Sequence, residues 1–143
     1  MRIPIGIALL TLIPFTAVAQ EAPVLRDLEA LSPLQLTKAE LGELLPGAKM
    51  LRVIANGNTH IWTNDLDGTF IVSSDNRATN YRSATGRGKW HVSDDGRYCI
   101  LIEWRASSEE WCRFLLKTSD GNYYTARSLK PGTEKAYKVE IRK

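Results

Sequence analysis

Few residues of this chain have the types and spacing that catalysis requires. Its two histidines, His60 and His91, lie 31 positions apart in the sequence. A nucleophilic site could combine His91 with Asp94 and with Ser73 or Ser93, but no Gly-x-Ser-x-Gly motif marks either serine. We therefore expect both histidines to be surface residues on strands, and we predict no catalytic residue.

The acidic pairs and the possible metal ligands do not indicate a catalytic or metal site either. Asp94 and Asp95 precede a glycine and are typical of a turn, and Glu109–Glu110 lies in a predicted loop, so neither pair would face a cleft. A metal shared by the two histidines would need a carboxylate such as Asp65. Asp65 also begins a calcium-loop-like stretch, but Asn76 stands where that loop needs its glutamate. The sequence predicts neither a metal site nor a cofactor.

Residues typical of binding surfaces are more frequent. The chain has four tryptophans and five tyrosines, with arginines between them, and these three residue types dominate binding hot spots. Strand alternation places Ile61 and Trp62 on opposite faces, so Trp62 faces either a pocket or a partner. Our candidates for an interaction surface or pocket are Trp62, Arg82, Trp90 and Trp104.

The two cysteines, Cys99 and Cys112, suit a structural disulfide if the chain is exported. A crosslink closing a loop of this length contributes roughly 3 kcal/mol to stability. The alternatives are a metal site, for which further soft ligands are not near in sequence, and a redox pair, for which Cys-x-x-Cys spacing is absent.

The N-terminus has the pattern of a secretory signal peptide. Arg2 precedes an apolar stretch from Ile3 to Phe15, and Ala17-Val18-Ala19 supplies the small residues before a cut. The alternative, a permanent anchor, requires a longer apolar segment. We predict residues 1–19 to be the signal peptide, a periplasmic or secreted location, and no integral membrane segment after cleavage.

Composition narrows the class of protein. The chain of 143 residues is 43% hydrophobic and 24% charged, which fits a folded domain. Its formal net charge is +3, too small to indicate a nucleic-acid partner.

Most of the chain is patterned as short strands. We predict a linker or arm over residues 20–33 and a single β-rich domain over 34–143. The domain begins with a helix over Leu34–Leu45, whose Thr37 and Glu40 form a capping box. Frequent turn signals then indicate a small antiparallel β-barrel or sandwich. The predicted strands are Lys49–Ala55, Thr59–Thr63, Thr69–Ser73, Ala78–Arg82, Lys89–Ser93, Arg97–Trp104, Trp111–Lys117, Asn122–Arg127 and Ala136–Ile141.

The two strands that carry the cysteines are apolar on both faces. Cys99, Leu101 and Cys112 share one face, whereas Tyr98 and Ile100 share the other. Such a hairpin is covered on both sides. The barrel interior would be one cover, and the predicted helix, a ligand or a partner would be the other.

Several short motifs resemble a family of small exported bacterial proteins, domain of unknown function 995. The resemblance runs from about Leu36 to Tyr124. It rests on the stretches Leu44-Leu45-Pro46-Gly47, Asp67-Gly68-Thr69, Gly88-Lys89-Trp90, Gly96-Arg97-Tyr98-Cys99, Trp104 and Cys112-Arg113. It implies an exported β-rich fold with a paired cysteine hairpin, and it implies no activity.

These observations favour an exported, non-enzymatic binding or interaction protein. The expected partner is a small apolar ligand or an envelope protein, and nucleic acid is not expected. The alternatives are a periplasmic enzyme with an unrecognised site and an inhibitor of an envelope enzyme.

We predict that export removes residues 1–19, because Ala17 and Ala19 occupy the small-residue positions before the cut. N-terminal sequencing of protein recovered from the periplasm should begin at Gln20. Recovered protein that still begins at Met1 would contradict this prediction.

Overall fold

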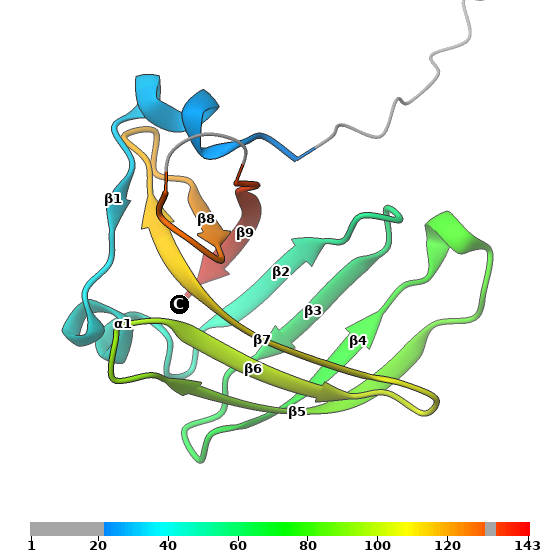
Figure 1. Cartoon of the computed structure of the whole chain (residues 1–143). Coiled ribbons are helices and arrows are strands. Elements are labelled where there is room, and N and C mark those ends of the chain that lie inside the picture. Colours follow the sequence, from blue (N-terminus) through cyan, green and yellow to red (C-terminus); the bar gives the residue numbers. More distant parts are fainter. Residues whose placement is uncertain (1–21, 131–133) are drawn as a thin grey trace, which may run out of the picture.

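Eight antiparallel strands form a closed barrel, and a ninth short strand extends its wall (Figure 1). The computed structural model describes residues 22–130 and 134–143. Around the barrel the order is β7-β6-β5-β4-β3-β2-β9-β8, and pairing of β8 with β7 closes the ring. β1 pairs with the C-terminal end of β7. The strands are β1 (Leu34–Gln35), β2 (Lys49–Val53), β3 (Thr59–Thr63), β4 (Thr69–Ser74), β5 (Ala84–Val92), β6 (Tyr98–Glu103), β7 (Ser108–Lys117), β8 (Tyr123–Ala126) and β9 (Tyr137–Arg142).

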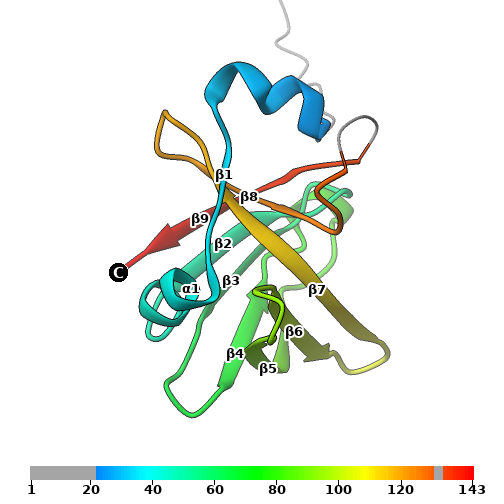
Figure 2. The same ribbon diagram turned by 60° about the vertical axis from the view of Figure 1, so that its left-hand side comes forward.

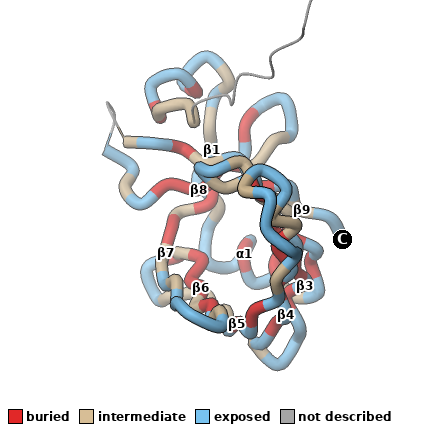
Figure 3. The backbone as a smooth tube through the Cα atoms, turned by 90° about the vertical axis from the view of Figure 1, so that its right-hand side faces the viewer, coloured by how far each residue is buried: buried red, intermediate tan, exposed pale blue. Residues whose placement is uncertain are grey.

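Alternate residues of each strand point into the barrel, as the period of two requires. Buried and exposed positions alternate strictly along β4, and the pattern can be followed along the tube in Figure 3. The inward-facing residues form one hydrophobic core. Its strand residues with the least exposure are Met50, Trp62, Phe70, Val72, Tyr98, Ile100, Ile102 and Leu115.

A short helix, α1 (Lys38–Leu44), closes one end of the barrel (Figures 1 and 2). The predicted capping box is present and starts the helix at Lys38: the Thr37 hydroxyl accepts the Glu40 N–H at 3.2 Å, and the Glu40 carboxylate accepts the Thr37 N–H at 2.7 Å. Leu41 and Leu45 are fully buried in the same core as the inward-facing strand residues. The predicted helix over Leu34–Leu45 is thus shorter, since Leu34 and its neighbour pair with β7 instead.

Buried polar groups join this helix to the barrel. The Trp62 indole N–H donates to Asn64 Oδ1 at 3.1 Å, and the Tyr98 hydroxyl donates to the same oxygen at 2.7 Å. The Asn64 side-chain amide in turn donates to the Leu45 carbonyl at 3.2 Å. Each buried donor therefore has a partner, which such a site needs to be stable.

The segment that we predicted as a linker or arm is partly structured. Residues Leu25–Leu31 form a 3₁₀ helix, η1, which lies over β8 (Figure 2). Leu25 and Leu28 are buried in a second apolar cluster with Tyr124 and Ala126 of β8. The spacing of three residues between the leucines suits a 3₁₀ helix and was hidden by the neighbouring Pro23 and charged residues.

The choice between barrel and sandwich is settled in favour of the barrel, and eight of the nine predicted strands form. The predicted strand Ala78–Arg82 was wrong. A 3₁₀ turn, η2 (Arg77–Thr79), stands there because Asn76 and Asn80 on either side have φ angles of 50° and 55°, which an extended strand cannot contain. The side chain of buried Asn58 holds this turn by accepting the Ala78 N–H at 3.0 Å.

The expected disulfide is present and joins Cys99 of β6 to Cys112 of β7, which are direct cross-strand partners. The two cysteines share one face, as the alternation predicted, and the structure shows that it is the outer face of the barrel. The helix does not cover this face, because its leucines pack inside, and Cys112 remains half-buried.

The predicted signal peptide, residues 1–19, lies outside the described residues. No helix within 22–130 and 134–143 is long and apolar enough to cross a membrane.

Two glycines of β5 make room for aromatic rings inside the barrel. A Cβ atom added to Gly88 would lie 2.1 Å from the Phe70 ring, and one added to Gly86 would lie 3.0 Å from the Trp104 ring. Because protein interiors are close-packed, a side chain at either glycine would displace the ring that lies against it.

We predict that Gly88→Ala destabilises the protein by about 1–3 kcal/mol, because Phe70 must leave its position. Gly42→Ala is the control. Gly42 lies in α1 with nothing within 4 Å of an added Cβ, so this substitution should stabilise by about 0.5–1 kcal/mol. Urea unfolding measures both, and a Gly88→Ala protein as stable as the parent would contradict the packing described.

Candidate functional site

The barrel wall is incomplete on the side of β8 and β9. There β7 pairs with β8 only over Phe114–Lys117, and β2 pairs with β9 only over Lys49–Leu51. No strand pairing on this side involves the N-terminal half of β7 in the described part of the chain. Inward-facing side chains therefore line this stretch of the wall without a neighbouring strand beside them.

The side chains at this stretch are charged and aromatic rather than aliphatic. We call them the interior cluster, and they are Arg52, His60, Trp104, Glu109, Trp111, Arg113 and Tyr137.

An ion pair links β2 to β7 within the interior cluster. Arg52 Nη2 lies 2.6 Å from Glu109 Oε1, and the Arg52 and Glu109 side chains are 11% and 32% exposed. The Trp111 indole N–H donates to the same carboxylate oxygen at 2.9 Å. Arg52 Nη2 also lies 3.2 Å from Nδ1 of His60, its cross-strand partner. One oxygen of the Glu109 carboxylate thus accepts from both a guanidinium and an indole.

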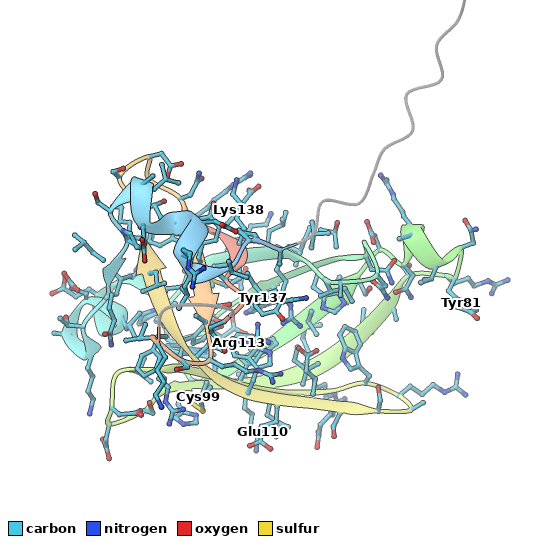
Figure 4. All side chains as sticks on the ribbon, turned by 45° about the horizontal axis from the view of Figure 1, so that its top comes forward. Tyr81, Cys99, Glu110, Arg113, Tyr137 and Lys138 are labelled. Carbon is cyan, nitrogen blue, oxygen red and sulfur yellow. A yellow bond between two sulfur atoms is a disulfide. The ribbon has the colours of Figure 1, made fainter. Side chains whose placement is uncertain are left out.

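Rings enclose the two guanidinium groups. The carbon atom of the Arg113 guanidinium lies 4.4 Å from the centre of the Trp111 ring and 4.7 Å from that of Tyr137. Arg52 lies 5.6 Å from the Trp111 ring, and these distances are within the range of cation–π attraction. In Figure 4, Arg113 and Tyr137 lie close together near the middle of the barrel, whereas Tyr81 lies at its periphery.

The charges of the interior cluster are not balanced. Burial, and then the Arg52 charge, lower the pKa of His60, so its ring is neutral at pH 7. Burial raises the pKa of Glu109, but Arg52 and the Trp111 hydrogen bond outweigh this effect and leave the pKa lowered. Burial, with Arg52 and Arg127 nearby, lowers the pKa of Arg113 to about 10. At pH 7 the interior cluster therefore holds two cations and one anion.

The expectation that His60 is a surface residue was wrong. His60 is only 5% exposed, because it shares the inward phase of β3 with Trp62, and its ring lies 5.1 Å from that of Trp104. His91 is exposed, as expected.

The four candidate binding residues are in different places. Trp104 belongs to the interior cluster. Trp62 faces inward but lies deeper, only 2% exposed and stacked on Phe70, and it contacts the interior cluster through Arg52 at 5.6 Å. Trp90 is half-buried against Tyr98, and Arg82 is exposed after η2.

Sequence reasoning placed only Trp104 of the interior cluster among the candidates and missed the other six members: Arg52, His60, Glu109, Trp111, Arg113 and Tyr137. The available signal was their phase. Residues 109, 111 and 113 alternate with Cys112, which is on the outer face, and Arg52 lies two positions after the buried Met50. A charged residue in the inward phase of a barrel strand is the feature to search for.

A hollow lies on the outer surface, away from the interior cluster. It has a volume of about 330 Å³ and is lined by residues of β4, β5 and β6, among them Ile71, Arg87 and Glu103. Among the described residues, no group of three or more histidine, cysteine or carboxylate side chains could hold a metal ion.

Comparison with protein families identifies the chain. The family described as "Protein of unknown function (DUF995)" matches residues 15–132. The chain belongs to this family. The family that the sequence motifs suggested is therefore confirmed, over a longer stretch of the chain. Comparisons with curated proteins and with solved structures found no match.

We predict that His60 makes stability depend on pH. Its folded pKa lies below its ordinary value of 6.5, so below that pH the unfolded chain binds more protons than the folded chain. Its contribution is complete above pH 6.5 and is lost as the pH falls toward the lowered pKa. His60→Gln should flatten the fall in stability between pH 7 and 5, measured by urea unfolding at each pH.

The matched control is His91→Gln, which replaces an exposed histidine. Its stability should depend on pH in the same way as that of the parent protein. Equal profiles for the parent and for His60→Gln would contradict the buried, neutral state of His60.

Proposed function

We propose that this protein is an exported, non-enzymatic binding protein that receives a small ligand at the interior cluster. One observation carries the proposal: aromatic and charged side chains face inward at the stretch where the wall is incomplete, and several of them still reach solvent. Trp104, Trp111 and Tyr137 are half-buried, and the Glu109 side chain is 32% exposed. Inward-facing residues reach solvent at an end of a barrel or where its wall is open. Trp104 and Glu109 lie beside the turn between β6 and β7, whereas Trp111 and Tyr137 lie along the incomplete wall.

A binding role suits these residue types. Tryptophan, tyrosine and arginine are the usual anchors of recognition, since they bury much area and lose little rotamer entropy for the contacts they form. A few polar groups among apolar walls are typical of small-molecule sites.

Support for a non-enzymatic role comes from the hydrogen bonds of His60. Its Nδ1 faces the Arg52 guanidinium, and among the described residues no serine, threonine or cysteine side chain hydrogen-bonds to the ring. A nucleophile that is activated by a histidine usually lies within hydrogen-bond reach of its ring. Export is supported by the disulfide, which persists in oxidising compartments, and by the signal-like N-terminus.

The proposal is tested first by native mass spectrometry of protein taken from the periplasm, which should reveal a retained small molecule. A binding assay then locates the site. The uncharged dye N-phenyl-1-naphthylamine should become fluorescent on binding. Trp111→Leu and Trp104→Leu should each weaken its affinity by about 10-fold, the loss expected for an aromatic anchor.

The matched control is Ile71→Ser, which alters the outer hollow and should leave dye affinity unchanged. The proposal is wrong if the dye does not bind, or if Ile71→Ser weakens binding while the two tryptophan variants do not.

A further inference from the structure

We infer that the ligand of the interior cluster is an organic anion, and that Arg113 binds its anionic group. This inference rests on the proposed function and names the chemical class of its ligand. The ligand class is an apolar or ring-bearing body that carries one carboxylate, sulfonate or phosphate group.

The first step is the position of Arg113. It is 9% exposed, and it lies in the inward phase of β7 between Trp111 and the fully buried Leu115. Its cross-strand partner on β6 is Tyr98, another interior residue. The guanidinium is therefore inside the barrel and cannot rely on bulk water for solvation.

The second step is the missing counter-charge. Within the described residues, no carboxylate lies within 4 Å of the Arg113 guanidinium. Glu109 is occupied by Arg52 at 2.6 Å. Among the residues that the structure describes, Arg113 makes one long hydrogen bond, from Nη1 to Thr125 Oγ1 at 3.5 Å, and its Nε–H has no partner there. A buried, unpaired cation with an unused donor is unfavourable, and an anion beside it removes both costs.

The third step is the shape of the surroundings. Trp111 and Tyr137 flank the guanidinium at 4.4 and 4.7 Å, and their rings accept no strong hydrogen bond. They leave the N–H donors for a ligand oxygen, and guanidinium groups bind carboxylate, sulfonate and phosphate oxygens in this way. The half-buried Trp104 and Trp111 rings offer apolar area to the rest of the ligand. The site thus suits a molecule with both parts.

A purely structural role for Arg113, as a cation held between two rings, predicts a different result. In that case removal of the charge would alter stability but would not discriminate between charged and uncharged ligands. The test therefore compares two dyes that share one body.

The dyes are 8-anilino-1-naphthalenesulfonate and N-phenyl-1-naphthylamine, which differ by the sulfonate. Arg113→Met should lower the affinity for the sulfonate dye about 10-fold or more, as expected for loss of a charge-assisted hydrogen bond. It should change the affinity of the uncharged dye less than about two-fold. Arg113→Lys, which keeps the charge but not the fork of donors, should show a smaller loss. The matched control, Arg87→Met on the outer face, should change neither affinity.

The outcomes separate the two proposals. If Arg113→Met weakens both dyes equally or neither, the anion inference is overturned while the binding function stands. If neither dye responds to Trp111→Leu, the proposed function itself is wrong. If Arg113→Met does not fold, the salt dependence of dye binding to the parent protein tests the inference instead. Raising sodium chloride from about 20 to about 500 mM should lower the affinity for the sulfonate dye but not for the uncharged dye. Salt-independent binding of the sulfonate dye overturns the inference.

Discussion

The shortness of β8 and β9 is the constraint on which the rest of the barrel depends. These strands pair with β7 and β2 only near the end closed by α1. Beyond that point no backbone hydrogen bonds join β7 to the far side of the barrel in the described residues, and the Arg52–Glu109 ion pair links the strands instead. Beside this stretch Arg113 and His60 are still buried, whereas Trp111 and Tyr137 are half-buried.

The interior is accordingly divided into two layers of different chemistry. Near α1 the core is apolar, and its few polar groups, such as Asn64, are fully paired and bring helix and strands together. Beside the incomplete wall the inward positions are charged or aromatic and are not fully paired. Natural proteins keep such local conflicts where function needs them, because a uniform aliphatic core is more stable than a half-satisfied polar one. The glycines of β5 support this division, since Gly88 admits Phe70 to the apolar layer and Gly86 admits Trp104 to the polar one.

The sequence alone indicated much of the fold, but only one residue of the interior cluster. Period-two alternation and turn residues predicted β3 to the residue, and the capping box of Thr37 and Glu40 was recognised although the helix was predicted to begin at Leu34. Barrel closure was not predictable, because it depends on β7 pairing with β8, a contact that no local pattern encodes. Arg52 and Glu109 come together from positions 57 residues apart, and a charged side chain in a strand is usually on the outer face. Trp104 was among the candidates because a large aromatic residue can anchor a ligand whether it faces into the barrel or outward.

The disulfide links this architecture to the proposed site. Cys99 and Cys112 are opposed on the outer face, so they fix the register of β6 against β7. A shift of one residue would turn every side chain of β7 to the other face, placing Arg113 and Trp111 outside and Cys112 inside. Because a buried, unpaired arginine disfavours the native register, a covalent bond next to it in sequence offsets that tendency. Formation of the Cys99–Cys112 disulfide thereby also favours the register in which the interior cluster faces inward.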